Sequence, residues 1–347
     1  MKRLAYILTV VLLALGAISC EHKDLCIHHR EHAHKFHIEV IADYRCDWEE
    51  HYDYIDWSKS WPDNYIDYDG LRPSTPKGLR VINYNENLES NTHNIAAEGG
   101  VVTLYEGPND ILLYNNDTEY ILFQRQQNGN KATTRATTRT RTRATYVGSE
   151  FTEKGEETMT PPDMLFANYI EGYVPEKSID PVEVPVTLQP LVYTYKIRYE
   201  FLEEDGGLQY VAYARGALSG MAASVLMDSG ETSAEGATLI FDNCEVTDYG
   251  VRALVTSFGI PGFPNENYLT RVENRKNGLN LEVILRNGKL LNFNFDVTEQ
   301  VQKQPHGGVI VVSGIQIKPE DGTQGSGAFD VDVNGWADYE DIILPLL

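Results

Sequence analysis

Apolar and polar side chains alternate along most of the chain, which is the pattern of strands that bury one face. In the first half, clusters of Asn, Asp, Gly and Pro separate the alternating stretches, which cover residues 36–42, 78–84, 100–105, 111–114 and 120–123. In the second half, the pattern returns at residues 182–188, 191–199, 238–241, 279–295, 308–312 and 342–346. Long amphipathic helices are hard to find, and residues 162–170 are expected to form a short helix or an irregular segment. The sequence therefore predicts an all-β protein.

Residues 279–295 predict a hairpin whose register can be worked out. Apolar residues alternate on both strands, at Leu279, Leu281, Val283 and Leu285 and then at Leu291, Phe293 and Phe295. A two-residue loop of Asn287 and Gly288 would place these two rows on opposite faces. A three-residue loop, residues 286–288 with Gly288 left-handed, pairs Val283 with Leu291 and places both rows on one face. We therefore predict the three-residue loop.

A change in composition divides the chain. Residues 126–146 are rich in Thr and Arg and almost free of large apolar side chains, so we expect a flexible linker. This places an N-terminal domain at residues 20–125 and a C-terminal domain at residues 147–347, and 347 residues are enough for two cores. A trypsin-like protease would find sites in such a linker at Arg135, Arg139, Arg141 and Arg143. A solvated loop without a role is the alternative interpretation.

The start of the chain is organised like a lipoprotein signal peptide. Lys2 and Arg3 precede an apolar run at residues 4–15, which is too short to span a bilayer comfortably. Small residues then lead to Cys20, so we expect residues 1–19 to be removed and the Cys20 thiol to be lipidated. Acyl chains would hold the protein on a membrane, because each buried methylene contributes about 0.8 kcal/mol. The alternative is an ordinary secretory signal with Cys20 in a disulfide.

The net charge limits the classes of binding partner, and the cysteine content limits the possible disulfides. The formal net charge is -22, from 51 acidic and 29 basic residues. Nucleic acid is not expected as a partner, because binding phosphates needs a basic surface. Besides Cys20, the chain has Cys26, Cys46 and Cys244, an odd number in a compartment where disulfides form. A Cys26–Cys46 disulfide and two separate thiols are equally consistent with the sequence.

Histidines gather near the start of the mature chain, at His28, His29, His32, His34 and His37. Imidazoles bind zinc or copper, but this spacing matches no closed metal site. We favour a polar tether and expect no bound metal. Motifs for a nucleophile elbow, a zinc protease, a phosphate loop or a dinucleotide site are absent from the sequence. We therefore expect neither an enzyme nor a cofactor.

Aromatic residues gather among aspartates at residues 44–68, and the candidates for ligand binding are Trp48, Trp57, Trp61 and Tyr65. Exposed rings beside carboxylates suit a carbohydrate-binding surface, because rings stack on the apolar faces of sugars and carboxylates accept hydrogen bonds from sugar hydroxyls. Packing against the rest of the protein is the simpler interpretation, since Trp and Tyr bury large apolar areas. The aspartates do not have the spacing of an EF-hand calcium loop.

Several stretches, spread over most of the chain, are specific as a set: Cys26-Ile27-His28-His29, Ile55-Asp56-Trp57-Ser58, Tyr114-Asn115-Asn116-Asp117-Thr118-Glu119, Leu191-Val192-Tyr193-Thr194-Tyr195, Leu218-Ser219-Gly220-Met221-Ala222, Phe295-Asp296-Val297-Thr298-Glu299-Gln300-Val301 and Gly307-Gly308-Val309-Ile310-Val311. With them, the chain resembles the Bacteroidetes lipoproteins of unknown function that are grouped with the fimbrillin-like proteins, the subunits and anchors of type V pili. The resemblance implies two β-sandwich domains with transthyretin-like Greek keys. Glu21 and Asp24, just after Cys20, also resemble the surface-export signal of Bacteroidetes lipoproteins, which implies an outward-facing position on the outer membrane.

The resemblance implies a structural or adhesive function, as a pilus anchor, an accessory subunit or an adhesin. The expected partners are the membrane, through the lipid on Cys20, and other pilus subunits. In type V pili, a protease removes an N-terminal strand and another subunit donates a strand to the groove, but here the arginine-rich segment lies between the predicted domains. The alternative is a standalone surface lipoprotein that binds a glycan or host ligand through residues 48–65.

Overall fold

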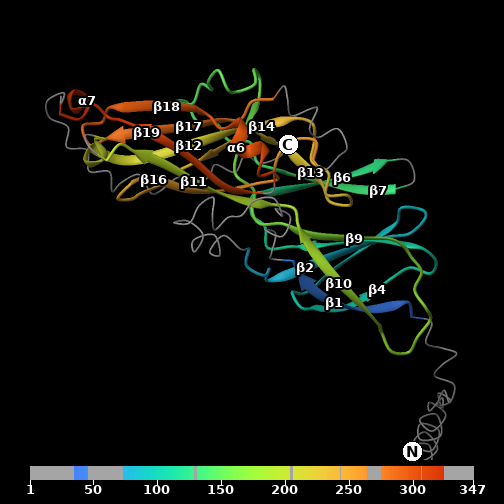
Figure 1. The fold of residues 1–347 in the computed structure, drawn as a ribbon. Helices are drawn as coiled ribbons and strands as arrows, with labels where there is room; N and C mark the ends of the chain where they lie inside the picture. The colour runs from blue at the N-terminus through green and yellow to red at the C-terminus, as the bar shows by residue number, and fades with distance from the viewer. Residues whose placement is uncertain are drawn as a thin grey trace, which may run out of the picture.

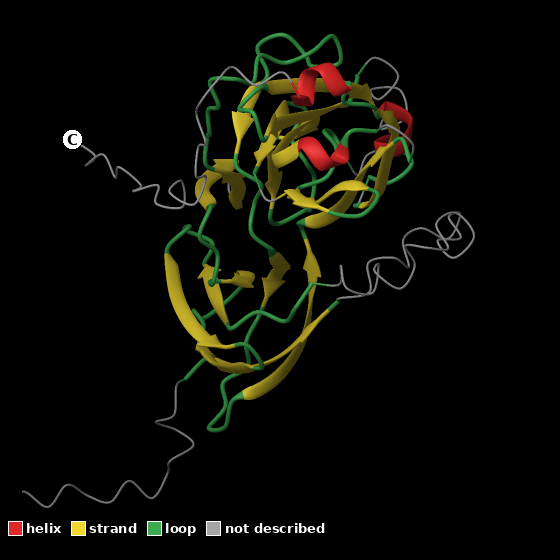
Figure 2. Cartoon of the chain, turned by 90° about the vertical axis from the view of Figure 1, so that its left-hand side faces the viewer, coloured by secondary structure: helices red, strands yellow, loops and turns green. Residues whose placement is uncertain are grey.

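The computed structural model describes residues 35–45, 73–128, 131–203, 206–242, 244–263, 275–305 and 307–323. Strands dominate these residues, and the helical segments are short: η2 (Leu208–Tyr210), α6 (Thr298–Gln302) and α7 (Pro319–Thr323) (Figures 1 and 2). The all-β prediction is confirmed. In the part of the chain that the structure describes, none of the helices is long and apolar enough to cross a membrane.

The N-terminal unit is one sheet that closes on itself. Its strands are β1 (His37–Tyr44), β2 (Gly78–Tyr84), β3 (Ser90–Ala96), β4 (Gly99–Thr103), β5 (Asn109–Asn115), β9 (Phe166–Tyr173) and β10 (Val182–Pro190), in the order β1-β10-β9-β5-β2-β3-β4. Their inward-facing residues form one apolar core, which includes Ile38, Val40, Leu79, Val81, Val102, Ile111, Leu113, Phe166 and Leu188. The predicted sandwich of two sheets is thus replaced here by a single closed sheet.

Gly99 shows why the closure needs a glycine. It begins β4, where the chain turns back from β3 and approaches β1. Its φ of +126° lies in the region that favours glycine, and an added Cβ would lie 1.8 Å from the backbone oxygen of Val40. A side chain at this position would therefore push β1 away from β4.

The second unit contains two facing sheets (Figure 1). One has the order β15-β16-β11-β19 and is built from β11 (Tyr193–Phe201), β15 (Cys244–Val246), β16 (Gly250–Ser257) and β19 (Gly308–Ile315). The other has the order β18-β17-β12-β14-β8 and is built from β8 (Glu157–Met159), β12 (Val211–Ala222), β14 (Gly236–Phe241), β17 (Gly278–Leu285) and β18 (Leu290–Asp296). Both sheets contribute to one buried cluster, which includes Tyr195, Ile197, Tyr199, Leu218, Leu239, Val251, Val255, Leu281, Val283 and Ile310.

The hairpin of β17 and β18 has the predicted register. Val283 lies opposite Leu291, and the Leu285 N–H donates to the Lys289 carbonyl over 2.9 Å. Gly288 has a φ of +82°, as a left-handed bulge position requires. The rows from both strands pack against the same core. The prediction of a three-residue loop is confirmed, whereas the expected helix or irregular segment at residues 162–170 is strand β9 from Phe166 onward.

The predicted linker is largely a strand, which corrects the division at residues 126–146. β7 (Lys131–Thr138) pairs with β6 (Ile121–Asn128) and β13 (Ser224–Leu226) in a three-stranded sheet. Alternate residues of β7 are buried, namely Ala132, Thr134, Ala136 and Thr138. These side chains are small, so the strand buries a face without the large apolar residues by which a buried strand is recognised in a sequence. The chain next contributes β8 to the second unit, returns to the closed sheet through β9 and β10, and enters the second unit again at β11.

The three-stranded sheet forms part of the joint between the two units (Figure 1). A third apolar cluster combines Ile82, Tyr84 and Leu112 of the closed sheet with Ala132 and Ala136 of β7, Val225 of β13 and Phe258 after β16. Lys131 adds ion pairs to Glu171 of β9 and to Asp228, which follows β13. The units are therefore joined by a buried apolar contact as well as by the chain itself.

Candidate functional site

Several predicted site residues lie outside the described residues: Cys20, Cys26, Cys46, Trp48, Trp57, Trp61 and Tyr65. Of the clustered histidines, His37 is described and is buried at the start of β1. Cys244 in β15 is a free, partly buried thiol, and burial raises its pKa to about 12. Across the described ranges, no group of three or more His, Cys, Asp or Glu could hold a metal ion.

The four predicted protease sites have different surroundings. Arg135 lies in β7 and donates to the Ser224 hydroxyl over 2.8 Å. Arg139 is exposed, but its backbone N–H donates to the carbonyl of Tyr120, and its own carbonyl accepts from Thr160. A loop cut by trypsin-like proteases has a free backbone, so the hydrogen-bonded backbone of these two residues argues against the predicted sensitivity.

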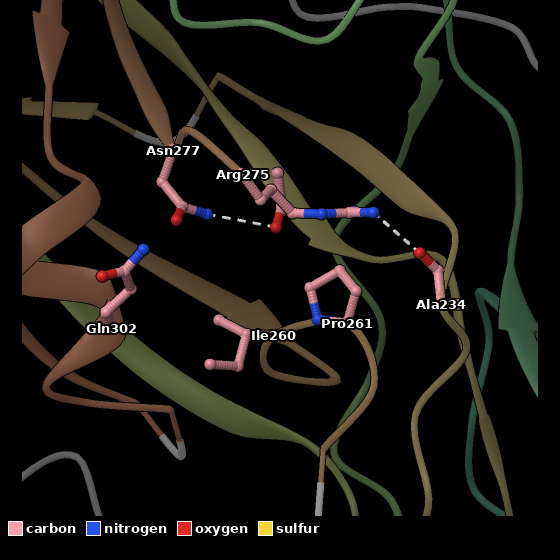
Figure 3. Close-up of a pocket in the computed structure, with 7 residues that line it drawn as sticks. Ala234, Ile260, Pro261, Arg275, Asn277 and Gln302 are labelled. Atoms are coloured by element: carbon pink, nitrogen blue, oxygen red, sulfur yellow. Dashed lines mark hydrogen bonds between the residues drawn. The ribbon is translucent and has the colours of Figure 1, made fainter. Parts of the chain in front are cut away.

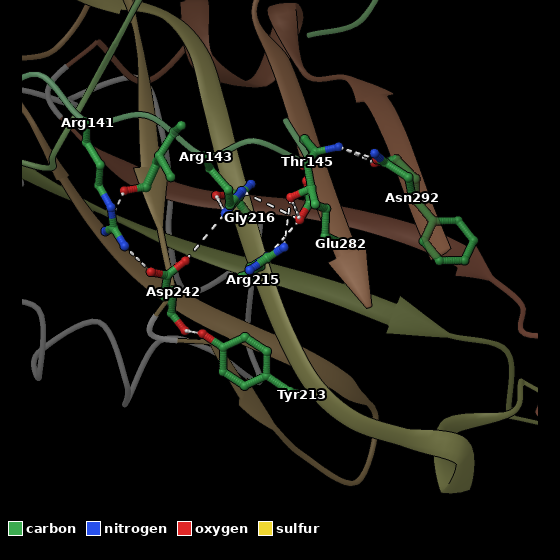
Figure 4. Close-up of polar contacts among 12 residues, drawn as sticks. Arg141, Arg143, Thr145, Tyr213, Arg215, Gly216, Asp242, Glu282 and Asn292 are labelled. Carbon is green, nitrogen blue, oxygen red and sulfur yellow. Dashed lines mark hydrogen bonds and ion pairs between the residues drawn. The ribbon is translucent and has the colours of Figure 1, made fainter. Parts of the chain in front are cut away.

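The other two arginines belong to a polar network on the sheet of β12 and β17 (Figure 4). Glu282 of β17 is fully buried and accepts hydrogen bonds from Arg215 Nε at 2.7 Å and from the Thr145 hydroxyl at 2.9 Å. Arg143 Nε lies 3.5 Å from the same carboxylate, and the Arg143 side chain is only 8% exposed. Arg143 also donates to the carbonyl of Gly216 over 3.1 Å. Residues 143–145 are thereby fixed across the strands.

Asp242 forms the second anionic centre of this network. It pairs with Arg141 and lies 3.5 Å from Arg143, while its backbone carbonyl accepts from the Tyr213 hydroxyl. Burial lowers the pKa of Arg143, while Glu282 and Asp242 act in the opposite direction. Guanidinium groups stay charged in proteins, so the network is held by ion pairs. Its arrangement fixes residues 141–145 to the sheet.

A small cavity lies at one end of the second unit (Figure 3). Its volume is about 250 Å³, and it is lined by Gly220, Ala234, Ile260, Pro261, Arg275, Asn277 and Gln302. Arg275 donates to the carbonyl of Ala234 over 2.7 Å, and the Asn277 amide donates to that of Gly220 over 3.1 Å. These polar groups are therefore used to fasten neighbouring loops and strands.

Glu156 lies close to this cavity. Its carboxylate accepts the Gly220 N–H over 2.7 Å, and burial raises its pKa, although hydrogen bonds from Gly220 and Thr238 act against the shift. A catalytic carboxylate needs a partner aimed at a substrate. Here the carboxylate instead holds the backbone where β12 changes its register against β14.

The fold thus defines an all-β protein of two joined units, and comparisons with known proteins identify its family. The chain belongs to the family described as "Domain of unknown function (DUF5119)", whose model matches residues 63–242. A curated relative from Bacteroides ovatus, "Putative fimbrium anchoring subunit Fim4B", is 27% identical over 205 residues, which is 58% of this chain and 58% of the relative. The chain therefore matches less than two thirds of the length of that relative.

Solved structures include similar proteins. The crystal structure titled as a "putative adhesin" from Bacteroides ovatus has a TM-score of 0.54 at 20% identity, covering 87% of this chain and 95% of that chain. "The fimbrial anchor protein Mfa2" from Porphyromonas gingivalis has a TM-score of 0.42 at 10% identity, covering 80% and 90%. The first likeness shows a shared fold. Together with the family match, the comparisons confirm the resemblance seen in the sequence.

Proposed function

We propose that the chain is a structural protein of the bacterial cell surface that serves a pilus as anchor or accessory subunit, or acts as an adhesin. The observation that carries this proposal is the similarity to a relative named as a fimbrium anchoring subunit. The fold shared with a protein titled as an adhesin supports it as well. A structural role also suits the described polar clusters, which fasten backbone segments instead of facing a substrate.

The architecture supports a role in bearing load. The units are joined by a buried apolar cluster, so a pull on one unit is transmitted to the other through packed side chains. We propose that the facing sheets of the second unit form the transthyretin-like Greek-key sandwich, and that the chain enters this domain twice, first between residues 139 and 159 and finally near Pro190, instead of once at residues 126–146. Attachment would come from the lipid on Cys20, at the outer membrane and facing outward.

The lipid anchor can be tested by replacing Cys20. Cells that express the full chain should carry it in the outer-membrane fraction, labelled by a clickable palmitate analogue, and protease added to intact cells should degrade it. The matched variant Cys20→Ala should lose the label and leave the membrane fraction. An unlabelled wild-type chain in the soluble fraction would contradict the proposed anchor.

A standalone ligand-binding lipoprotein is the alternative, and glycan binding by Trp48, Trp57, Trp61 and Tyr65 stays a prediction. A glycan array probed with the purified mature chain separates the two functions. Specific binding that is lost in Trp57→Ala and Trp61→Ala would favour the alternative.

A further inference from the structure

Strand β19 lies at an edge of its sheet. On one side it pairs in parallel with β11, from Tyr195 opposite Gly308 to Phe201 opposite Ile315. On its other side, no strand pairs with it among the residues that the structure describes. An open edge presents unpaired N–H and C=O groups and is a template for another strand.

The sequence of β19 makes an open edge hazardous. Residues 308–315 read Gly-Val-Ile-Val-Val-Ser-Gly-Ile, with no charged residue and no proline. Short, uncharged segments rich in β-branched residues are those that associate with copies of themselves. The exposed edge of this strand would therefore pair readily with the same edge of a second copy.

Two glutamines occupy the outer edge. The Gln304 amide accepts the Val309 N–H over 2.7 Å and donates to the Val309 carbonyl over 2.9 Å. The Gln300 amide does the same for Val311, accepting its N–H over 2.8 Å and donating to its carbonyl over 2.9 Å. Each side chain thus pairs with both polar groups of one residue, as a neighbouring strand would.

The spacing of the two glutamines explains this match. Four residues of a helix advance about 6 Å along its axis. Two residues of a strand advance about 6.6 Å. Gln300 in α6 and Gln304 just after it can therefore reach the outward-facing peptide groups of Val309 and Val311. Glutamine suits the task, because its amide carries a donor and an acceptor side by side, like the peptide group itself.

The glutamines are also held in place by the core. Gln304 is 1% exposed, and its backbone carbonyl accepts the hydroxyl of the buried Tyr195 over 2.7 Å. The Gln304 amide donates in addition to the carbonyl of Gln300 over 3.0 Å. Val301, between them in the sequence, is fully buried in the core of the second unit. This fixed position distinguishes the pair from a chance surface contact.

We propose that Gln300 and Gln304 form a clip that stands in for the next strand and closes the β19 edge against a second copy of this chain. The clip leaves the strand fully hydrogen-bonded at Val309 and Val311 without extending the sheet. Any assembly of this protein by strand pairing would then have to use another edge. The inference goes beyond the proposed function and holds whether or not the protein belongs to a pilus.

The test removes the clip from the mature chain and measures self-association. In Gln300→Ala/Gln304→Met, methionine keeps much of the buried volume but has no amide. The matched control is Glu299→Ala, because Glu299 lies on the same helix, is 83% exposed and pairs with Lys303 alone among the described residues. Light scattering after size exclusion should show a mass that rises with concentration for the double variant, and a constant mass for the wild type and the control. A double variant that is folded by circular dichroism and associates no more than the control would overturn the proposal.

Hydrogen exchange of the wild type gives a second test that does not depend on any variant folding. The Val309 and Val311 amides should be protected although they lie on an edge, and in the single variant Gln300→Ala the Val311 amide should exchange about fivefold faster. Single-residue fragmentation in the mass spectrometer resolves the two positions. Exchange of both wild-type amides at the rate of a free edge would overturn the proposal, even if the double variant failed to fold.

Discussion

Glu282 is the buried carboxylate on which the arginine network depends, and Glu282→Gln tests that network. Gln keeps the shape of the side chain and can still accept from the Thr145 hydroxyl, but it removes the negative charge opposite Arg143 and Arg215. Arg143 would remain buried, with Asp242 at 3.5 Å as its remaining charged partner. We therefore expect the variant to be markedly less stable.

The size of the effect follows from burial. Removing one partner of a buried ion pair costs about 3–5 kcal/mol. The Arg215 side chain is 21% exposed and can recover some hydration, and Asp242 still faces Arg143, so we expect the lower end, about 3 kcal/mol. The matched control is Glu245→Gln, because Glu245 pairs with Arg252 on the surface. Exposed pairs contribute about 0–1 kcal/mol.

Urea unfolding followed by circular dichroism measures the free energy of unfolding of both variants and of the wild type. The slope of this free energy against urea concentration should be the same in all three proteins. Limited trypsin digestion adds a local readout, because release of residues 141–145 exposes Arg141 and Arg143. Cleavage there should be slow in the wild type. In Glu282→Gln it should be up to about a hundredfold faster, if the whole loss of stability makes the local opening of residues 141–145 easier. The reasoning is refuted if Glu282→Gln costs no more than Glu245→Gln, or if trypsin cuts both variants equally.

Three further predictions concern single residues. At pH 8 a thiol with a pKa of about 12, like that of Cys244, is ionised to only about one part in ten thousand. A maleimide or disulfide reagent should therefore modify Cys244 about a thousandfold more slowly in the folded than in the unfolded chain. Peptide mass mapping measures both rates, and equal rates would contradict the prediction. Burial raises the pKa of Glu156, so the folded chain holds this proton more tightly than the unfolded chain, and the resulting stabilisation is lost as the pH rises from the ordinary glutamate pKa through the raised value. Glu156→Gln should flatten the pH dependence of the thermal midpoint within that window, and an unchanged profile would contradict the prediction. Leu165→Ala, in the fully buried joint, should cost about 2–5 kcal/mol in chemical unfolding, and a loss under 1 kcal/mol would show a loosely packed joint.

Alternation of large apolar residues predicted many of the strands that pack one face on a core. The β17–β18 hairpin could be predicted to the residue, because two apolar rows and one glycine leave a single register that buries both rows together. The all-β class follows from the same pattern. Strands with many small or polar side chains gave a weaker signal, and β3 (Ser90–Ala96), β7, β12 and β16 were not predicted.

The predicted linker failed for a physical reason. β7 buries Ala and Thr on one face, and its neighbours β6 and β13 supply the larger apolar side chains of the joint. The low hydrophobicity of β7 therefore reflects the small side chains that it packs between the two units, and it does not prevent the segment from folding as a strand. Seeing this from sequence would require knowing that β13, almost ninety residues later, pairs with it.

The polar network and the glutamine clip could not be predicted from local pattern either. Glu282 stands in an apolar strand as an isolated carboxylate, and only the return of residues 141–145 across the sheet supplies its partners. Gln300 and Gln304 have a helical spacing, but their role depends on the edge of β19 lying beside them. In both cases, the partner is set by tertiary contacts.

The proposed surface role in a pilus is tested most directly by immunogold labelling of intact cells, together with a blot of the sheared pilus fraction, using a deletion strain as the control. We predict label on the outside of intact cells, along filaments or at their bases, and a change in filament number or attachment in the deletion strain. Label that appears only after permeabilisation, or surface label unrelated to filaments with unchanged pili in the deletion strain, would contradict the account.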